Sequence, residues 1–162
     1  MYISRRLNEN LVTFHSLHFP FVSHKKTSFP YEVTVGIGGN IGDVRRRFER
    51  LFFYLKRERF VVVTKTSLIL KNPPFGYKEQ DDFFNSIIVL KTAMQPKAFL
   101  QYLHRIEKRF GRKRSFANAP RTLDLDILFF DNRQINTDEL TIPHAAWHQR
   151  ESVVIPLSGV RR

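Results

Sequence analysis

Cysteine is absent from this sequence and acids are scarce: 27 Lys and Arg residues stand against 15 Asp and Glu among 162 residues. The absence of Cys excludes disulfides, thiol catalysis and Cys-ligated zinc. No run approaches the roughly 18 consecutive apolar residues of a membrane-spanning helix, and residues 1–30 lack the apolar stretch of a secretory signal. We therefore expect a cytoplasmic protein with no membrane partner, in which any metal binds oxygen or His ligands.

Two nucleotide-binding loops are also missing. The sequence contains no G-x-x-x-x-G-K-[ST] phosphate loop, and its GIGGNI stretch at 36–41 fails the G-x-G-x-x-G pattern at the last position. P-loop and Rossmann chemistry are therefore disfavoured. A tight turn between a strand and a helix explains these glycines better.

The sequence is rich in apolar residues and in positive charge. Apolar residues make up 42% of the chain, with sixteen Phe, which is enough for the core of one domain. The net charge of +12 indicates a polyanionic partner: a nucleic acid, an anionic membrane or a nucleoside triphosphate. One basic block, at 45–59, alternates with apolar residues at helical spacing, so we interpret it as a solvated helix face. A second block runs from Arg105 to Arg114 and leads to Arg121.

Hydrophobic periodicity and turn residues predict an α+β fold. The expected elements are, in order, a strand at 31–39, a helix at 44–59, strands at 60–71 and 82–92, a helix at 96–110 and a strand within 119–131. This βαββαβ order is that of ferredoxin-like folds, in which an antiparallel sheet carries its helices packed on one face. Residues 1–30 fall outside the pattern, so we expect an N-terminal extension that could be flexible, followed by one domain at 31–162.

Two aspartates interrupt the apolar run of the last expected strand. Asp124 and Asp126 point to the same face because side chains alternate along a strand, and they lie roughly 6.5–7 Å apart. Such carboxylates repel each other unless one is protonated or a cation lies between them, and Mg²⁺ accepts one or two carboxylates together with waters and phosphates. An isolated D-x-D is more often the solvent-facing half of an amphipathic strand.

The context of the pair favours a metal site. Leu128 and Phe130 continue the aspartate face as apolar residues, so the pair marks the wet end of the strand. The preceding loop carries Arg112, Arg114 and Arg121, and guanidinium groups match phosphate oxygens bidentately. Carboxylates beside several arginines indicate the transfer of a nucleotide phosphate group.

Seven segments resemble those of a known family. They are GGNIGD (38–43), NPPFG (72–76), DFFN (82–85), RIE (105–107), GR (111–112), PRTLDLDI (120–127) and IPH (142–144). Over about residues 33–157 the chain resembles the 6-hydroxymethyl-7,8-dihydropterin pyrophosphokinases of folate biosynthesis. The resemblance implies a ferredoxin-like enzyme that transfers pyrophosphate from ATP to the hydroxymethyl group of the pterin, releases AMP and uses two Mg²⁺ ions.

The resemblance also implies a role for individual residues. Asp124 and Asp126 would hold both magnesium ions, and Arg112 and Arg121 would be the catalytic arginines that grip the α- and β-phosphates. Further contacts to ATP would come from Glu107, Arg114, Ile127, Thr141 and His144. The pterin would be bound by Asn72, Pro73, Phe75, Phe83 and Asn85.

The chain departs from this family at several positions. Glu139 stands where some members have an ATP-contacting Arg, and Ser152 stands where an aromatic residue commonly stacks on the second face of the pterin. Trp147 is a candidate to take over that stacking role. The loop SFANAP at 115–120 is one residue shorter than in familiar members, with Asn118 where a Trp is common.

Two other functions stay open on the sequence alone. A ferredoxin-like sheet with many Phe residues and a high positive charge also describes an RNA-binding module, but the acidic pair would repel a phosphate backbone and the RNP1 run is absent. The other alternative is a catalytically impaired binder of pterin or nucleotide, because Glu139 and Ser152 could signal lost contacts. We expect ATP and the pterin as partners, no nucleic acid, and a monomer.

Overall fold

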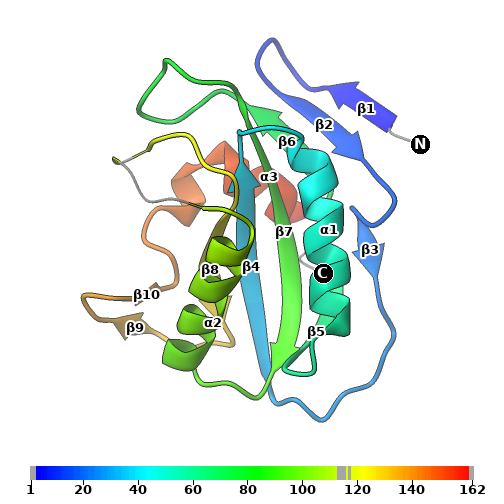
Figure 1. Ribbon diagram of the computed structural model, residues 1–162, viewed down its shortest axis with the longest axis vertical. Coiled ribbons are helices and arrows are strands. Elements are labelled where there is room, and N and C mark those ends of the chain that lie inside the picture. The colour runs from blue at the N-terminus through cyan, green and yellow to red at the C-terminus, as the bar shows by residue number, and fades with distance from the viewer. Residues whose placement is uncertain (1–2, 113–115, 117, 161–162) are drawn as a thin grey trace.

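One antiparallel sheet forms the centre of the molecule in a computed structural model, which describes residues 3–112, 116 and 118–160. Its strands are β1 (Ile3–Arg6), β2 (Val12–His15), β3 (Phe21–Val22), β4 (Tyr31–Gly39), β5 (Val61–Thr66), β6 (Ile69–Asn72), β7 (Phe83–Thr92) and β8 (Asp124–Phe130). They lie in the order β1-β2-β6-β7-β4-β8, and β5 pairs with both β7 and β3. The four strand regions expected from the sequence therefore take the ferredoxin-like order, with β4 and β7 in the middle (Figure 1).

Two helices cover one face of this sheet, as the sequence predicted. The side chain of Asp43 caps α1 (Val44–Arg57) by accepting a hydrogen bond from the Arg46 amide, and Pro96 opens α2 (Pro96–Arg109). Both helices bury apolar side chains at three- and four-residue spacing against β4, β5, β7 and β8. The α+β fold with two helices on one face is confirmed.

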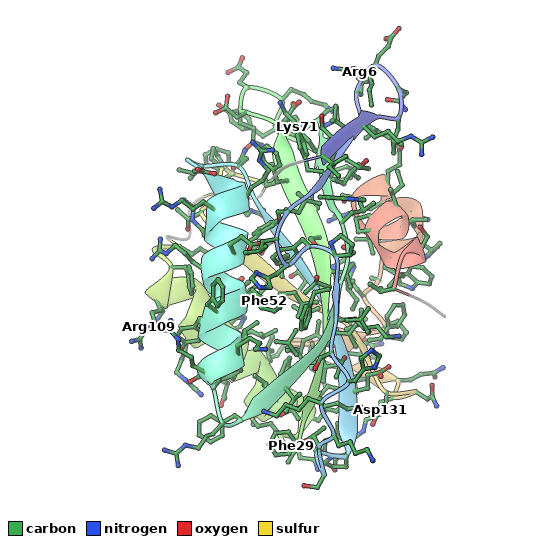
Figure 2. The ribbon with its side chains drawn as sticks, turned by 90° about the vertical axis from the view of Figure 1, so that its right-hand side faces the viewer. Arg6, Phe29, Phe52, Lys71, Arg109 and Asp131 are labelled. Carbon is green, nitrogen blue, oxygen red and sulfur yellow. The ribbon has the colours of Figure 1, made fainter. Side chains whose placement is uncertain are left out.

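A third helix covers the other face and was not predicted. Figure 2 shows α3 (Glu151–Ser158) on the side of the sheet opposite to α1. Leu157 packs there with Ile87, Val89 and Leu128 in a second apolar cluster. A small hairpin of β9 (Ile135–Asn136) and β10 (Thr141–Ile142) completes the described elements, and no helix among them is long and apolar enough to cross a membrane.

The single strand expected at 60–71 is broken into β5 and β6. At the break, the hydroxyl of Ser67 contacts the Ser86 hydroxyl at 2.9 Å and accepts a hydrogen bond from the Ile87 amide at 2.9 Å. A side chain thus takes the place of a backbone group in the ladder with β7. Because the chain bends here, β5 and β6 each pair with a different N-terminal strand.

The expectation that Phe130 lies on the same face as the aspartates is wrong, because β8 contains an irregularity. Thr34 pairs with Phe129 but Val35 pairs with Ile127, so Leu128 is an extra residue in β8. Leu128 stays on the aspartate face and packs below α3, as expected. Phe130, in contrast, is turned to the helix-covered face, where its ring lies 6.2 Å from that of Phe99.

Residues 3–22, which the sequence placed in an extension that could be flexible, form three strands on the sheet. β2 pairs with β6, β1 pairs with β2, and β3 pairs with β5. Between β2 and β3 the chain crosses α1: Phe19 is fully buried, the His18 ring stacks on Phe52 at 4.3 Å, and Glu49 accepts hydrogen bonds from Ser16 and from the His18 amide. This segment therefore contributes to the main core.

Candidate active site

Six of the predicted site residues gather at the end of the sheet that is uppermost in Figure 1, on the face of α3. The strand register places Asn85 of β7, Gly38 of β4 and Asp124 of β8 in one row across three neighbouring strands. Since strands lie about 4.8 Å apart, roughly 10 Å separates the backbones of Asn85 and Asp124. A pocket opens above this row, and its lining consists of Asn72, Phe75, Phe83, Asn85, Asn118, Arg121, Asp124, Arg150 and Ser152.

Gly38 leaves room for the Asn85 side chain beside this pocket. A Cβ at Gly38 would lie 2.6 Å from the amide oxygen of Asn85, so no other residue leaves that side chain in place. The Asn85 amide nitrogen in turn donates to the amide oxygen of Asn72 at 2.6 Å. The glycines that the sequence assigned to a turn therefore also permit a close approach, and they leave a pair of oriented amides on one wall.

The opposite wall is a network of charges. Arg112 donates to Glu107 at 2.5 Å and to Asp124 at 2.7 Å, and Arg121 donates to the other oxygen of Asp124 at 2.8 Å. Glu107, only 3% exposed, also accepts a hydrogen bond from the Leu125 amide at 2.7 Å. Burial lowers the pKa of Arg112, but the carboxylates of Asp124 and Glu107 outweigh it and hold that pKa above its ordinary value. Both predicted catalytic arginines thus meet one predicted metal ligand.

Asp126 is the uncompensated member of this network. Burial, together with the charges of Asp124 and Glu107, raises the pKa of Asp126 to about 7, although Arg121 and Arg112 act in the opposite direction. Among the described residues, no hydrogen bond or ion pair engages its carboxylate. A mostly buried carboxylate next to a second one favours a bound cation.

A metal ion at this pair would need further ligands. Within residues 3–112, 116 and 118–160, no three His, Cys, Asp or Glu side chains form a group that could hold a metal by themselves. Two carboxylates two residues apart on β8, one of them in a pocket lined by Arg121, suit a hard ion whose remaining ligands are waters and phosphate oxygens. The donor set therefore fits magnesium bound together with a polyphosphate.

The residues expected to contact ATP are less concentrated. His144 donates its backbone N–H to the Leu128 carbonyl at 3.0 Å, and its pKa is lowered by burial and by the nearby charge of Arg150. Thr141 is exposed on β10, whereas the Ile127 side chain is buried in the core on the helix side. Arg114 lies outside the described residues.

Hydrogen bonds connect three loops around the pocket, and they involve residues that were not among the predicted site residues. Asn40 accepts a hydrogen bond from the Arg121 amide at 2.9 Å and donates to Gln80 at 2.8 Å. Gln80 donates to the Asn118 carbonyl at 2.8 Å. The GGN stretch was a visible signal for Asn40, but only the fold brings Gln80 and Asn118 together.

The aromatic wall of the pocket also differs from expectation. The Trp147 ring packs on Phe129 at 5.2 Å and is not part of the pocket lining, which gives no support to its proposed stacking role. Arg150 is found there instead, with its guanidinium carbon 4.7 Å from the centre of the Phe75 ring. No motif in the sequence distinguished this arginine from the other basic residues.

Comparison with known proteins assigns the chain to a family. The family described as 7,8-dihydro-6-hydroxymethylpterin-pyrophosphokinase matches residues 34–162. The 2-amino-4-hydroxy-6-hydroxymethyldihydropteridine pyrophosphokinase of Helicobacter pylori is 38% identical over 145 residues, which cover 88% of this chain and 89% of that protein. The enzyme of the same name from Campylobacter jejuni is 39% identical over 145 residues, covering 90% and 92%. With most of its length matched in both comparisons, the chain belongs to the 7,8-dihydro-6-hydroxymethylpterin-pyrophosphokinase family.

Proposed function

We propose that this chain transfers the pyrophosphoryl group of ATP to the hydroxymethyl group of 6-hydroxymethyl-7,8-dihydropterin, forming the pterin diphosphate and AMP for folate biosynthesis. The observation that carries the proposal is one pocket with two unlike walls. Oriented amides stand on one side, and Asp124 with Arg121 stands on the other, where Arg112 also bonds to Asp124. Such a pocket suits a flat heterocycle on one side and a polyphosphate on the other.

The pterin would bind at the amide wall. Asn85 and Asn72 offer donors and acceptors for the edge of the heterocycle, and their mutual hydrogen bond fixes which groups point outward. Phe83 lies two residues from Asn85 on the same face of β7, and Phe75, 64% exposed, is the aromatic residue of the loop above. The carbonyl of Pro73, which already accepts from Asn72, completes this wall.

The phosphates of ATP would bind at the charged wall. Asp124 and Asp126 would hold two Mg²⁺ ions, which orient the phosphates and neutralise charge that develops during transfer. Arg112 and Arg121 now neutralise Asp124, and they become available to phosphate oxygens once a metal takes over that carboxylate. Glu107 would then act by keeping Arg112 in place, since its carboxylate is enclosed and already bonded.

The chemical step needs no covalent intermediate on the protein. The hydroxymethyl oxygen of the pterin bonds to the β-phosphorus, while the bond from that phosphorus to the oxygen bridging to the α-phosphorus breaks. AMP leaves with the bridging oxygen, and the hydroxyl proton is released. The chain's own contribution is to position the two substrates and to offset the negative charge.

The nucleoside would extend towards the β9–β10 hairpin. A cavity of about 540 Å³ lies between α2 and this hairpin, with apolar walls from Leu100, Ile135 and Leu140. Thr141 and His144 follow directly along the chain, and Glu139 is an acidic member of the lining. This cavity supports a binding place for the adenine base.

Release of AMP tests the proposal directly. Purified protein is mixed with ATP, magnesium and 6-hydroxymethyl-7,8-dihydropterin, and AMP is compared with that formed in reactions without the pterin or with excess chelator. We expect AMP only when both pterin and magnesium are present. A folded protein that binds the pterin but releases no AMP would point to the impaired binder, and one that binds neither substrate would refute the proposal.

A further inference from the structure

Arg150 is the residue of the pocket for which neither the sequence nor the family comparison gave a role. It immediately precedes α3, and the two backbone hydrogen bonds that its carbonyl accepts from Val153 and Val154 fix its main chain at the helix start. Its side chain extends from there into the pocket, where it lines one wall together with Phe75, Phe83 and Ser152. The guanidinium carbon lies 4.7 Å from the centre of the Phe75 ring.

Among the residues that the structure describes, this guanidinium has no polar partner in the pocket. Within that part of the chain its buried Nε atom makes no hydrogen bond, and no carboxylate pairs with the group. The pocket's own aspartate, Asp124, is already engaged by Arg112 and Arg121. Leaving a buried donor unsatisfied is costly, so a cation placed this way indicates a ligand that satisfies it.

The contact with Phe75 indicates that the guanidinium can stack on a flat ring. Guanidinium groups are flat and weakly hydrated, and they stack on aromatic faces. Phe75 is 64% exposed and belongs to the loop between β6 and β7, so a buried ring does not force the stack. Ser152, which lines the same wall, is small and leaves the space beside Arg150 to a ligand.

We propose that Arg150 is a pterin-binding residue whose guanidinium stacks on one face of the heterocycle, with its Nε–H available to the ring's acceptors. The inference rests on the proposed function, because the pterin is the flat substrate of that reaction. Arg150 would then cover the second face of the pterin, for which the sequence had suggested the aromatic residue Trp147. Arg150 thus joins the amide pair of Asn72 and Asn85 in recognising the heterocycle.

The test is the dissociation constant of the pterin, measured at equilibrium by fluorescence or calorimetry in the absence of ATP. Replacing Arg150 with Ala should weaken pterin binding about 10- to 30-fold, as expected for loss of a desolvated cation–π contact. Arg150→Lys keeps the charge but not the flat group, so it should recover only a small part of the affinity. Adding Ser152→Phe to Arg150→Ala restores a flat group to this wall and should recover most of it.

Arg109 provides a matched control. Its guanidinium carbon also lies over an aromatic ring, 5.6 Å from the centre of Tyr54, but Figure 2 shows Arg109 beside α1, across the sheet from α3. Arg109→Ala should leave pterin affinity unchanged. Thermal unfolding of each variant checks that it is folded. If Arg150→Ala does not fold, the affinity of Arg150→Lys is used to test the stacking role instead.

The outcomes separate the two proposals. If the unmodified protein does not bind the pterin, the proposed function itself fails. If it binds the pterin and Arg150→Ala binds equally well, the role of Arg150 is refuted while the proposed function stands. Equal affinity of Arg150→Lys and the unmodified protein would refute stacking, because a point charge would then be sufficient.

Discussion

Replacing Asp126 with Asn should stabilise the magnesium-free protein above neutral pH. The carboxylate of Asp126 is mostly buried beside Asp124 and has no hydrogen-bond or ion-pair partner among the described residues, so ionising it in the folded state is unfavourable. Asn has nearly the same shape but no charge to ionise. The substitution thus removes an unfavourable free-energy term that the proposed metal site would explain and that the fold does not need.

The size of the effect follows from the pKa of Asp126, which rises from 3.8 to about 7 on folding. Because the folded state holds its proton more tightly than the unfolded state, stability falls as the pH rises from about 4 to about 7, and is constant above. A shift of about 3 units corresponds to at most about 4 kcal/mol at 1.36 kcal/mol per unit. The gain in stability is smaller than this limit, because water can reach the carboxylate and because the new amide has hydrogen-bonding groups that are not satisfied. We therefore expect a gain of about 1–3 kcal/mol.

Urea denaturation at pH 5, 6, 7 and 8 with chelator measures this difference. The stability of Asp126→Asn relative to the unmodified protein should be smallest at pH 5 and largest at pH 8, where the melting temperature should rise by about 3–10 °C. Asp138→Asn, at an exposed position, is the control and should show no such trend. A relative stability that is flat or declines towards pH 8 would refute the assignment of Asp126 as an uncompensated carboxylate.

Three further predictions follow from other parts of the structure. Asp124→Ala should lower pterin-dependent AMP release by about 10²–10⁴-fold while pterin binding without ATP stays within a few fold, and near-normal turnover would contradict its role at the phosphates. Gly38→Ala should weaken pterin binding about tenfold, because the new Cβ would displace the amide oxygen of Asn85 from 2.6 Å, and unchanged affinity in a binding assay would argue against that amide as a ligand. Phe19→Ala should lower the free energy of unfolding by about 3–5 kcal/mol in urea, whereas Leu17→Ala, at a side chain 76% exposed, should change it by less than about 0.5 kcal/mol; similar losses would mean that residues 3–22 do not pack as described.

The parts of the fold that the sequence predicted are those with long, regular patterns. Pro96 and the spacing of apolar residues located both long helices, and alternation located β4, β7 and β8. α3 was missed because its sequence, ESVVIPLS, is short, weakly amphipathic and contains Pro156. The strands at residues 3–22 were missed because two to four residues cannot show a period.

The same distinction applies to the site. Asp124, Asp126 and Arg121 lie close together in the sequence, and their local pattern was enough to indicate a phosphate and metal site. Arg150 and Phe75 are 75 residues apart, and they meet only because α3 packs over β6 and β7. The turn of Phe130 to the helix side likewise depends on one unpaired residue, Leu128, which strict alternation cannot reveal.

The pairing of β2 with β6 has a consequence for self-association. Without residues 3–22, β6 would be an outer strand of the sheet, and its unpaired amides beside the buried side chains of Ile69 and Leu70 would form a template for another chain. With them, the outermost strand is β1, whose four residues are all exposed and include Arg5 and Arg6. A short, positively charged border of this kind disfavours pairing with the edge strand of another copy.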